Sequence, residues 1–199
     1  MSVNLVKGQK VDLRKSDGGS LTNVMVGLGW DEAQKHGSLL SSLFGGSQDS
    51  IDCDASAFVC QNGKIAEKGD IVYFGNLRHK SDCVRHMGDN LTGAGDGDDE
   101  QIFVDLRNLP QQYDKIIFVV NIYMAKARKQ HFGMIQNAFI RICDERGQEL
   151  CKYNLSENYD NMTAMVFGEL YRHNGAWKFN AIGQATTDDS VDMLARRFC

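Results

Sequence analysis

The sequence lacks a long hydrophobic segment. Its longest wholly apolar run covers only residues 116–120, whereas a helix needs about 20 apolar residues to span a bilayer. We therefore expect no transmembrane segment in this chain.

Cysteine motifs are also missing. The six cysteines are scattered with no Cys-x-x-Cys pair, and neither they nor the five histidines have the spacing of a zinc site. No secretory leader is recognised ahead of them. We expect free thiols in a reducing cytosol, and hence a cytoplasmic protein.

A strong charge excess is absent as well. The 22 basic and 26 acidic side chains give a net charge of -4, which is too mild to indicate a nucleic-acid partner. The 42% hydrophobic and 24% charged fractions are typical of a globular protein. The sequence therefore predicts a single domain over residues 1–199 that does not bind nucleic acid.

Short apolar or β-branched runs, separated by Gly, Asn and Asp, are present along most of the chain. Their length and their flanking residues favour strands over helices. Many short strands joined by tight turns predict an all-β fold, a two-sheet antiparallel β-sandwich. The predicted strands are residues 24–30, 57–60, 71–74, 101–106, 116–123, 138–143, 164–171 and 177–182.

Three turns between these runs have recognisable signals. Asn62-Gly63 and Asn174-Gly175 are the pairs that a type I′ hairpin turn prefers. Gly8, between residues 3–5 and 11–13, predicts a third hairpin near the N-terminus. All three predictions rest on local turn chemistry alone.

One short helix is expected at the C-terminus, over residues 188–199. Val191, Leu194, Ala195 and Phe198 recur at the spacing of one apolar helix face, and Ser190 is available as a cap. We expect this helix to lie on the outside of a sheet.

Residues 88–100 combine glycines with an unusual density of oxygen-bearing side chains. The glycines let the backbone turn sharply, and no Lys or Arg occurs from residue 89 to residue 106. Calcium takes six to eight oxygen ligands, and a bound cation would relieve the repulsion among the carboxylates. The segment therefore predicts a calcium site, although a solvated acidic loop has a similar composition. Its side-chain oxygens come from Asp89, Asn90, Asp96, Asp98, Asp99 and Glu100.

Three further carboxylates could bind the same ion or a neighbouring one. In a strand, Asp52 and Asp54 would point to one side and Cys53 to the other, while Asp31 directly follows a predicted strand. The spacing does not match an EF-hand, because counting from Asp89 puts Leu91 at the third ligand position. Any calcium site here is of another type.

Five motifs in the same order carry a specific resemblance. Together, over about residues 3–183, they make the chain resemble the TerD family of tellurium-resistance and stress proteins. The motifs are Val-Gly-Leu-Gly-Trp-Asp at 26–31, Asp-x-Asp-Ala-Ser-Ala-Phe at 52–58, the acidic loop at 88–100, residues 132–141, and Gly-Glu-Leu-Tyr-Arg-His at 168–173.

This resemblance implies a bacterial, cytoplasmic, calcium-binding β-sandwich associated with resistance to tellurite and other chemical stress. It implies that other Ter-type stress proteins are partners, near the membrane surface, and that more than one calcium ion (Ca2+) is bound. The implied metal positions are Asp31, Asp52, Asp54, Asp89, Asn90, Asp96, Asp98, Asp99 and Glu100.

The sequence departs from the family pattern in two places. Residues 32–51 form a longer stretch than is usual and indicate an insertion or mobile loop. Tyr123-Met124 replaces a His/acidic pair, so this loop is not expected to supply a metal ligand.

Three functions are consistent with the sequence. The first is a calcium-dependent interaction protein that is not an enzyme. The second is a metal-dependent enzyme or a nucleotide- or phosphate-binding protein that uses the acidic site, although no histidine lies within that loop. The third is a membrane-surface adaptor that uses calcium to bridge anionic lipid.

Overall fold

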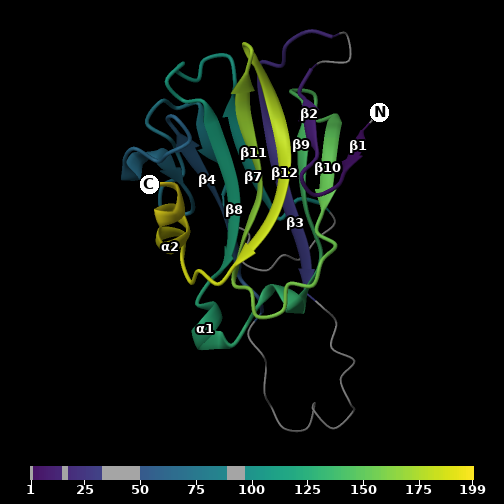
Figure 1. Ribbon diagram of the computed structural model, residues 1–199, viewed down its shortest axis with the longest axis vertical. Coiled ribbons are helices and arrows are strands. Elements are labelled where there is room, and N and C mark those ends of the chain that lie inside the picture. The colour runs from purple at the N-terminus through teal and green to yellow at the C-terminus, as the bar shows by residue number, and fades with distance from the viewer. Residues whose placement is uncertain (1, 15–17, 33–49, 89–96) are drawn as a thin grey trace.

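The computed structural model describes residues 2–14, 18–32, 50–88 and 97–199. Two six-stranded sheets pack face to face (Figure 1), which confirms the predicted β-sandwich. In order across the sheet, sheet A contains β1 (Val3–Leu5), β10 (Glu149–Asn154), β9 (Ile135–Cys143), β3 (Asn23–Glu32), β7 (Glu100–Asp105) and β6 (Val84–His86). Sheet B contains β2 (Lys10–Asp12), β12 (Ala176–Thr186), β11 (Ala164–His173), β8 (Lys115–Ile122), β4 (Cys53–Cys60) and β5 (Ile71–Val72).

Each predicted run contains a strand. The paired strands are antiparallel except for β1 and β10, which run parallel. The sequence did not predict β6 or β10. β6 has only three residues, and β10 contains the charged residues Glu149 and Lys152, so neither stands out as an apolar run.

Two of the three predicted hairpins are confirmed. Asn62 and Gly63 have φ of 52° and 74°, and Asn174 and Gly175 have φ of 50° and 76°, as type I′ turns require.

The third predicted hairpin is wrong, although its turn forms, with the Gln9 N–H donating to the Val6 carbonyl at 2.9 Å. The chain crosses from one sheet to the other at this turn, because β1 pairs with β10 and β2 pairs with β12. A local turn signal does not determine which sheet a following strand joins.

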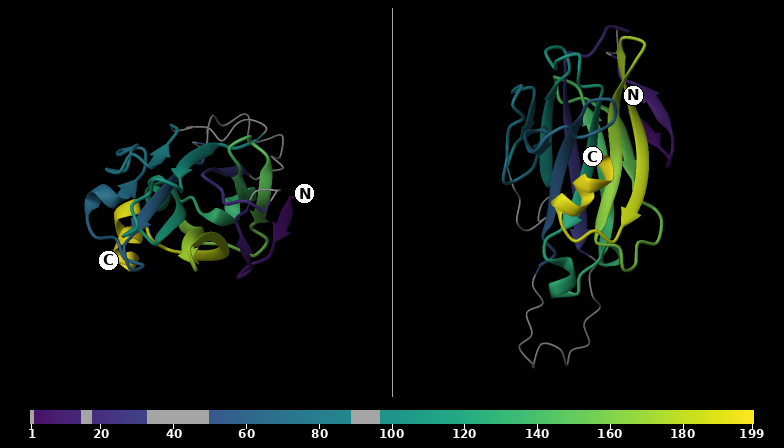
Figure 2. Two further views of the ribbon diagram at one scale, coloured as in Figure 1. Left: turned by 90° about the horizontal axis from the view of Figure 1, so that it is seen from above. Right: turned by 60° about the vertical axis from the view of Figure 1, so that its left-hand side comes forward.

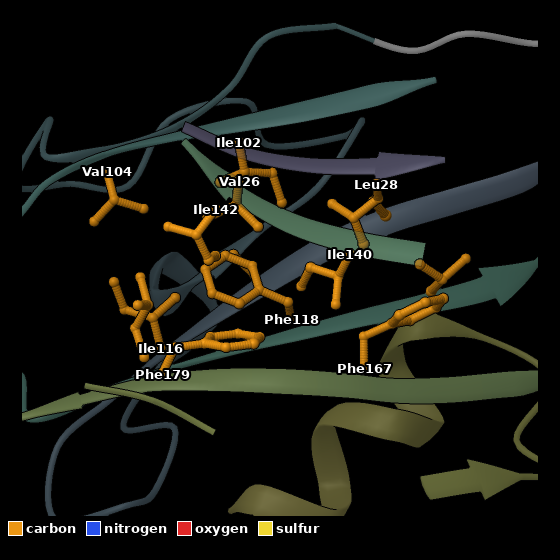
Figure 3. Close-up of a cluster of buried hydrophobic side chains, with 14 of the residues drawn as sticks. Val26, Leu28, Ile102, Val104, Ile116, Phe118, Ile140, Ile142, Phe167 and Phe179 are labelled. Carbon is orange, nitrogen blue, oxygen red and sulfur yellow. The ribbon is translucent and has the colours of Figure 1, made fainter. Parts of the chain in front are cut away.

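The core fills the space between the two sheets. Figure 3 shows Val26, Ile102 and Ile140 of sheet A facing Phe118, Phe167 and Phe179 of sheet B. Trp30 and Trp177 are 4% and 7% exposed, so both belong to this packing. Burial of each such side chain contributes about 1.5–3 kcal/mol.

The predicted C-terminal helix is present as α2 (Val191–Ala195) and a following 3-10 turn, Arg196–Phe198. Ser190 caps it by accepting a hydrogen bond from the Met193 N–H at 3.3 Å. Leu194 packs in a second apolar cluster on the outside of sheet B, with Phe58 and Val119, and Figure 2 shows the helix against that face.

Shorter helical turns complete the described chain. They are α1 (Ala125–Arg128) and the 3-10 turns Lys68–Asp70 and Phe132–Met134. No helix within the described ranges has the length and apolar character needed to cross a bilayer.

Candidate metal centre

Three strands bring acidic residues to one end of the sandwich. β3 ends at Glu32, and β7, which pairs with it antiparallel, begins at Glu100. In the facing sheet, β4 begins nearby at Cys53, since the Ala55 N–H donates to Glu100. This end lies at the bottom of Figure 1 and collects the predicted carboxylates that the structure describes.

Glu100 points inward, in line with the core residues Ile102 and Val104 of its own strand. It is 2% exposed, and its Oε2 accepts a hydrogen bond from the Ala55 N–H at 2.5 Å. The carboxylate thus joins sheet A to β4 of sheet B. An ionised carboxylate in such a position is stable only with compensating partners.

His86 lies beside Glu100, with Nε2 3.4 Å from its Oε2. The Gly88 N–H donates to Nδ1 at 3.2 Å, so Nδ1 carries no proton and Nε2–H is the donor to the Ala55 carbonyl at 3.2 Å. His86 therefore supplies Glu100 with a polar neighbour and links β6 to β4 through the Ala55 carbonyl.

Asp99 lies at the end of β3. Its backbone N–H donates to the Leu28 carbonyl at 2.8 Å, and its Oδ2 accepts from the Trp30 N–H at 2.7 Å. Burial raises the pKa of Asp99, the Trp30 N–H opposes the shift, and the charges of Asp31 and Asp98 add to it. A nearby cation would favour the ionised form of this carboxylate.

Asp98 points the other way, onto the outer face of sheet A. Arg141 donates to its two carboxylate oxygens at 2.7 and 3.0 Å, and Gln101 Nε2 donates at 3.0 Å. The bond to Asp98 raises the pKa of Arg141. Asp98 therefore already has a cationic partner, Arg141. The structure does not bring the Asp98 carboxylate together with that of Glu100.

Asp52 and Asp54 flank Cys53. β4 begins at Cys53, so Asp52 precedes the strand, and its carbonyl accepts from the Tyr123 N–H at 2.7 Å. Cys53 faces the core between the sheets, as do Ala55 and Ala57. The alternation therefore puts Asp54, which is 5% exposed, on the opposite side of β4, as predicted.

Asp31 is exposed at this same end. Its Oδ2 accepts a hydrogen bond from Asn137 Nδ2 at 2.8 Å, and its charge acts on Asp99. It is thus close to Asp99 but held by a residue of β9.

The thiol of Cys53 is buried, and the charges of several of these carboxylates act on its pKa. Burial raises the pKa of Cys53, and the charges of Asp54, Glu100, Asp52 and Asp99 raise it further. All four charges therefore act on one buried thiol, Glu100 from the core side of β4 and Asp54 from its opposite side. We call these four carboxylates the acidic cluster.

The acidic cluster fits calcium in kind, because carboxylate oxygens are the hard ligands that calcium prefers. Among the described residues, no three His, Cys, Asp or Glu side chains form a group that could hold a metal ion by themselves. The predicted ligands Asp89, Asn90 and Asp96 lie outside the described residues, as does the 33–49 part of the predicted insertion.

Sequence reasoning missed three residues that shape this end. Arg141 donates to Asp98, and His86 lies beside Glu100. Gly27 leaves the space in which the Asp98 carboxylate lies, because a Cβ atom on Gly27 would be 2.2 Å from Asp98 Oδ1. The signal for Gly27 was available, because glycines inside an apolar strand indicate a close approach by other atoms. The partners of the other two depend on pairing between distant strands.

The fold and these residues define an all-β sandwich protein with a cluster of carboxylates at one end. A family model described as the TerD domain matches residues 1–198. The chain belongs to the TerD family.

Two curated relatives match almost the full length. The chain is 48% identical over 199 residues to the stress response protein SCP2 of Bacillus subtilis (strain 168), covering 100% of both chains. It is 48% identical over 198 residues to the tellurium resistance protein TerD of Serratia marcescens, covering 98% of this chain and 97% of that one. Both names describe resistance or stress response rather than a reaction.

A solved structure shares the fold. It is described as a homologue of the telluride resistance protein TerD from Streptomyces coelicolor A3(2), with a TM-score of 0.65 and 19% identity. The match covers 90% of this chain and 99% of that one. At this identity the likeness concerns the fold alone.

Proposed function

We propose that this chain is a calcium-binding protein of tellurium resistance and the chemical stress response, and that it acts through calcium-dependent interaction rather than catalysis. The observation that carries the calcium part is that hydrogen bonds to β3 and β4 bring the acidic cluster to one end of the sandwich, where its charges act together on the buried Cys53. The names of the relatives support the stress role. We further propose a cytoplasmic location, other Ter-type stress proteins as partners near the membrane surface, and more than one bound ion.

The electrostatics of the acidic cluster favour a divalent cation. Glu100 and Asp54 are 2% and 5% exposed, and burial already disfavours the charge on Asp99. Bringing such carboxylates together costs free energy that a bound cation offsets. Asp52, Asp54, Asp99 and Glu100 would contribute to holding calcium, which would supply positive charge and order at this end of the sandwich.

The surroundings of His86 support a role other than catalysis. Both of its ring nitrogens lie in hydrogen bonds with the backbone, to Gly88 and Ala55. A general base needs a ring nitrogen that can reach a substrate. This histidine is held instead as a link between the sheets.

Thermal unfolding and calorimetric titration test the calcium proposal. A ligand present at a hundredfold excess over its Kd stabilises the folded state by about 2.7 kcal/mol, so calcium should raise the melting temperature and EDTA should lower it. Glu100→Gln removes one negative charge and keeps a side-chain oxygen that can accept the Ala55 N–H. Asp99→Asn likewise removes one negative charge and keeps an oxygen that can accept the Trp30 N–H. Both variants should bind calcium at least about tenfold more weakly.

Asp192→Asn is the matched control, because it removes one carboxylate from an exposed position on α2. It should bind calcium like the wild type. Identical melting curves with calcium and with EDTA would refute the proposal. Calcium- or magnesium-dependent phosphoester hydrolysis that is lost in Asp54→Asn would favour the enzyme alternative.

A further inference from the structure

A polar cavity lies at the opposite end of the sandwich from the acidic cluster. It has a volume of about 520 Å³ and is lined in part by the start of β12 and the turn that joins it to β11. That turn is at the top of Figure 1, whereas β7 and β4 begin near the bottom. The cavity therefore shares no residue with the proposed calcium site.

Three arginines line this cavity, each from a different segment. Arg14 precedes residues 15–17, which lie outside the described chain, and it forms an isolated bridge with Ser20. Arg107 follows β7 and donates its backbone N–H to the Thr22 carbonyl at 3.1 Å. Arg172 lies near the end of β11, opposite Trp177 of β12. Three distant parts of the sequence thus direct cationic residues to one recess.

Arg172 is fixed in place by the surrounding structure. Its Nε donates to the Tyr113 carbonyl at 3.0 Å, its Nη2 donates to the Leu109 carbonyl at 2.7 Å, and its guanidinium lies 4.5 Å from the centre of the Trp177 ring. Burial lowers the pKa of Arg172, and the Asp114 charge opposes that shift. The three contacts orient the guanidinium before any ligand arrives, which reduces the entropy lost on binding.

The acidic groups near this recess do not line it. Among the described residues, no Asp or Glu contributes to the cavity wall. Asp12 is paired with Lys178 at 2.9 Å, and Glu145 accepts a hydrogen bond from Thr22 at 2.6 Å. Three cationic residues in one cavity wall repel one another, and an anion would offset that repulsion.

We propose that this cavity binds a small molecule that carries a phosphate group. Arginine presents a planar fork of N–H donors that matches phosphate oxygens in pairs, and Arg14 and Arg107 are exposed residues of the cavity wall. The cavity has room for more than a bare phosphate, because pockets for small organic ligands measure about 300–1,000 Å³. The class of ligand is therefore a phosphomonoester such as a sugar phosphate.

Calorimetric titration of the full chain tests this site, in calcium-free buffer so that the result does not depend on the calcium proposal. The probes are inorganic phosphate, ribose 5-phosphate and uncharged ribose. Ribose 5-phosphate should bind more tightly than phosphate, and ribose should not bind. The paired substitution of Arg14→Gln and Arg107→Gln should weaken binding by about tenfold or more, because each change removes charge-assisted hydrogen bonds.

Arg146→Gln is the matched control, because Arg146 is exposed in the turn between β9 and β10 and is not part of the cavity wall. It removes one positive charge without touching the site, so it should bind ribose 5-phosphate like the wild type. The melting temperature of each variant without ligand shows that it is folded. Absence of binding by both phosphate probes at millimolar concentration would overturn the proposal. So would a loss of binding free energy in Arg146→Gln that is half the loss in the paired variant, which removes two charges, because binding would then depend on overall charge alone.

Discussion

Gly27 determines where the Asp98 carboxylate lies. In sheet A, Gly27 pairs with Arg141 on one side and with Gln101 on the other. Both of these side chains donate to Asp98, which lies in the space that a side chain at position 27 would fill. A glycine on β3 thus creates the position in which a charged residue of the acidic segment is neutralised.

Gly27→Ala should therefore destabilise the protein. The added Cβ would lie 2.2 Å from Asp98 Oδ1, so the carboxylate must move and weaken its bonds to Arg141. We expect the free energy of unfolding to fall by about 1–3 kcal/mol, as measured by urea denaturation. Gly69→Ala is the control, because its nearest neighbour is the flexible Lys80 side chain at 4.0 Å. Equal stability of the two variants would contradict this account.

His79 gives the protein a predictable response to acid. Its Nε2 lies 3.1 Å from Asp70 Oδ1, and both side chains are fully buried. The Ser81 N–H donates to Nδ1 at 3.2 Å, so this nitrogen carries no proton. Burial lowers the pKa of His79 below its usual 6.5, although Asp70 opposes the shift.

The sign of the pH effect follows from this lowered pKa. Below about pH 6.5 the unfolded chain takes up a proton at His79 before the folded chain does, so stability is complete above that pH and falls as the pH falls below it. The loss should reach a slope of at most about 1.4 kcal/mol per pH unit, measured by denaturation between pH 7.5 and 5.5. His79→Gln should reduce that slope, whereas His173→Gln, at the exposed end of β11, should not. If both variants keep the wild-type slope, His79 is not the source.

At the scale of elements, α2 covers the outside of sheet B with very few residues. Leu194 is 0% exposed and packs with Phe58, Ile117 and Val119. Leu194→Ala should therefore lower the free energy of unfolding by about 2–4 kcal/mol, through lost burial and the cavity that remains. Met193→Ala, next to it but 41% exposed, should change stability by less than about 0.5 kcal/mol. A small effect of Leu194→Ala would show that α2 is not required to cover this sheet.

The sequence predicted elements whose signals are local. Asn62-Gly63 and Asn174-Gly175 specify their turns through two adjacent residues, and the face of α2 follows from a helical period. The sequence could not predict which strand β2 pairs with after the Gly8 turn. β2 pairs with the edge of β12, a strand near the other end of the chain. Strand pairing at long range is not encoded in a short window of sequence.

The same distinction applies to the candidate metal centre. Composition indicated an anionic site, and the structure brings Asp52, Asp54, Asp99 and Glu100 close enough for their charges to raise the pKa of Cys53. Composition could not show that three consecutive acids take different partners, with Asp98 bound by Arg141, Asp99 by the backbone of Trp30 and Glu100 by that of Ala55. Those partners come from two sheets and from three different strands.

At the scale of the whole molecule, the acidic cluster and the arginine cavity lie at opposite ends of the sandwich. The acidic cluster lies where β7 and β4 begin, and the arginine cavity lies where β11 ends and β12 begins. The core between the two sheets, part of which Figure 3 shows, fills the space between the sheets along the sandwich. The described residues of the two sites do not overlap, so each should bind its ligand without altering the other.

Additivity of the two ligands tests this independence. Calcium and ribose 5-phosphate should each raise the free energy of unfolding, and the increment with both should equal the sum of the separate increments within about 0.5 kcal/mol. Ribose 5-phosphate is preferred to inorganic phosphate, because calcium phosphate is poorly soluble. A control mixture without protein, monitored with a calcium electrode, measures how much calcium the sugar phosphate itself removes. A change of more than about fivefold in either affinity when the other ligand is saturating would show coupling of at least about 1 kcal/mol. Since a coupling free energy acts equally in both directions, that result would mean that the sandwich has a second arrangement to which both ends respond.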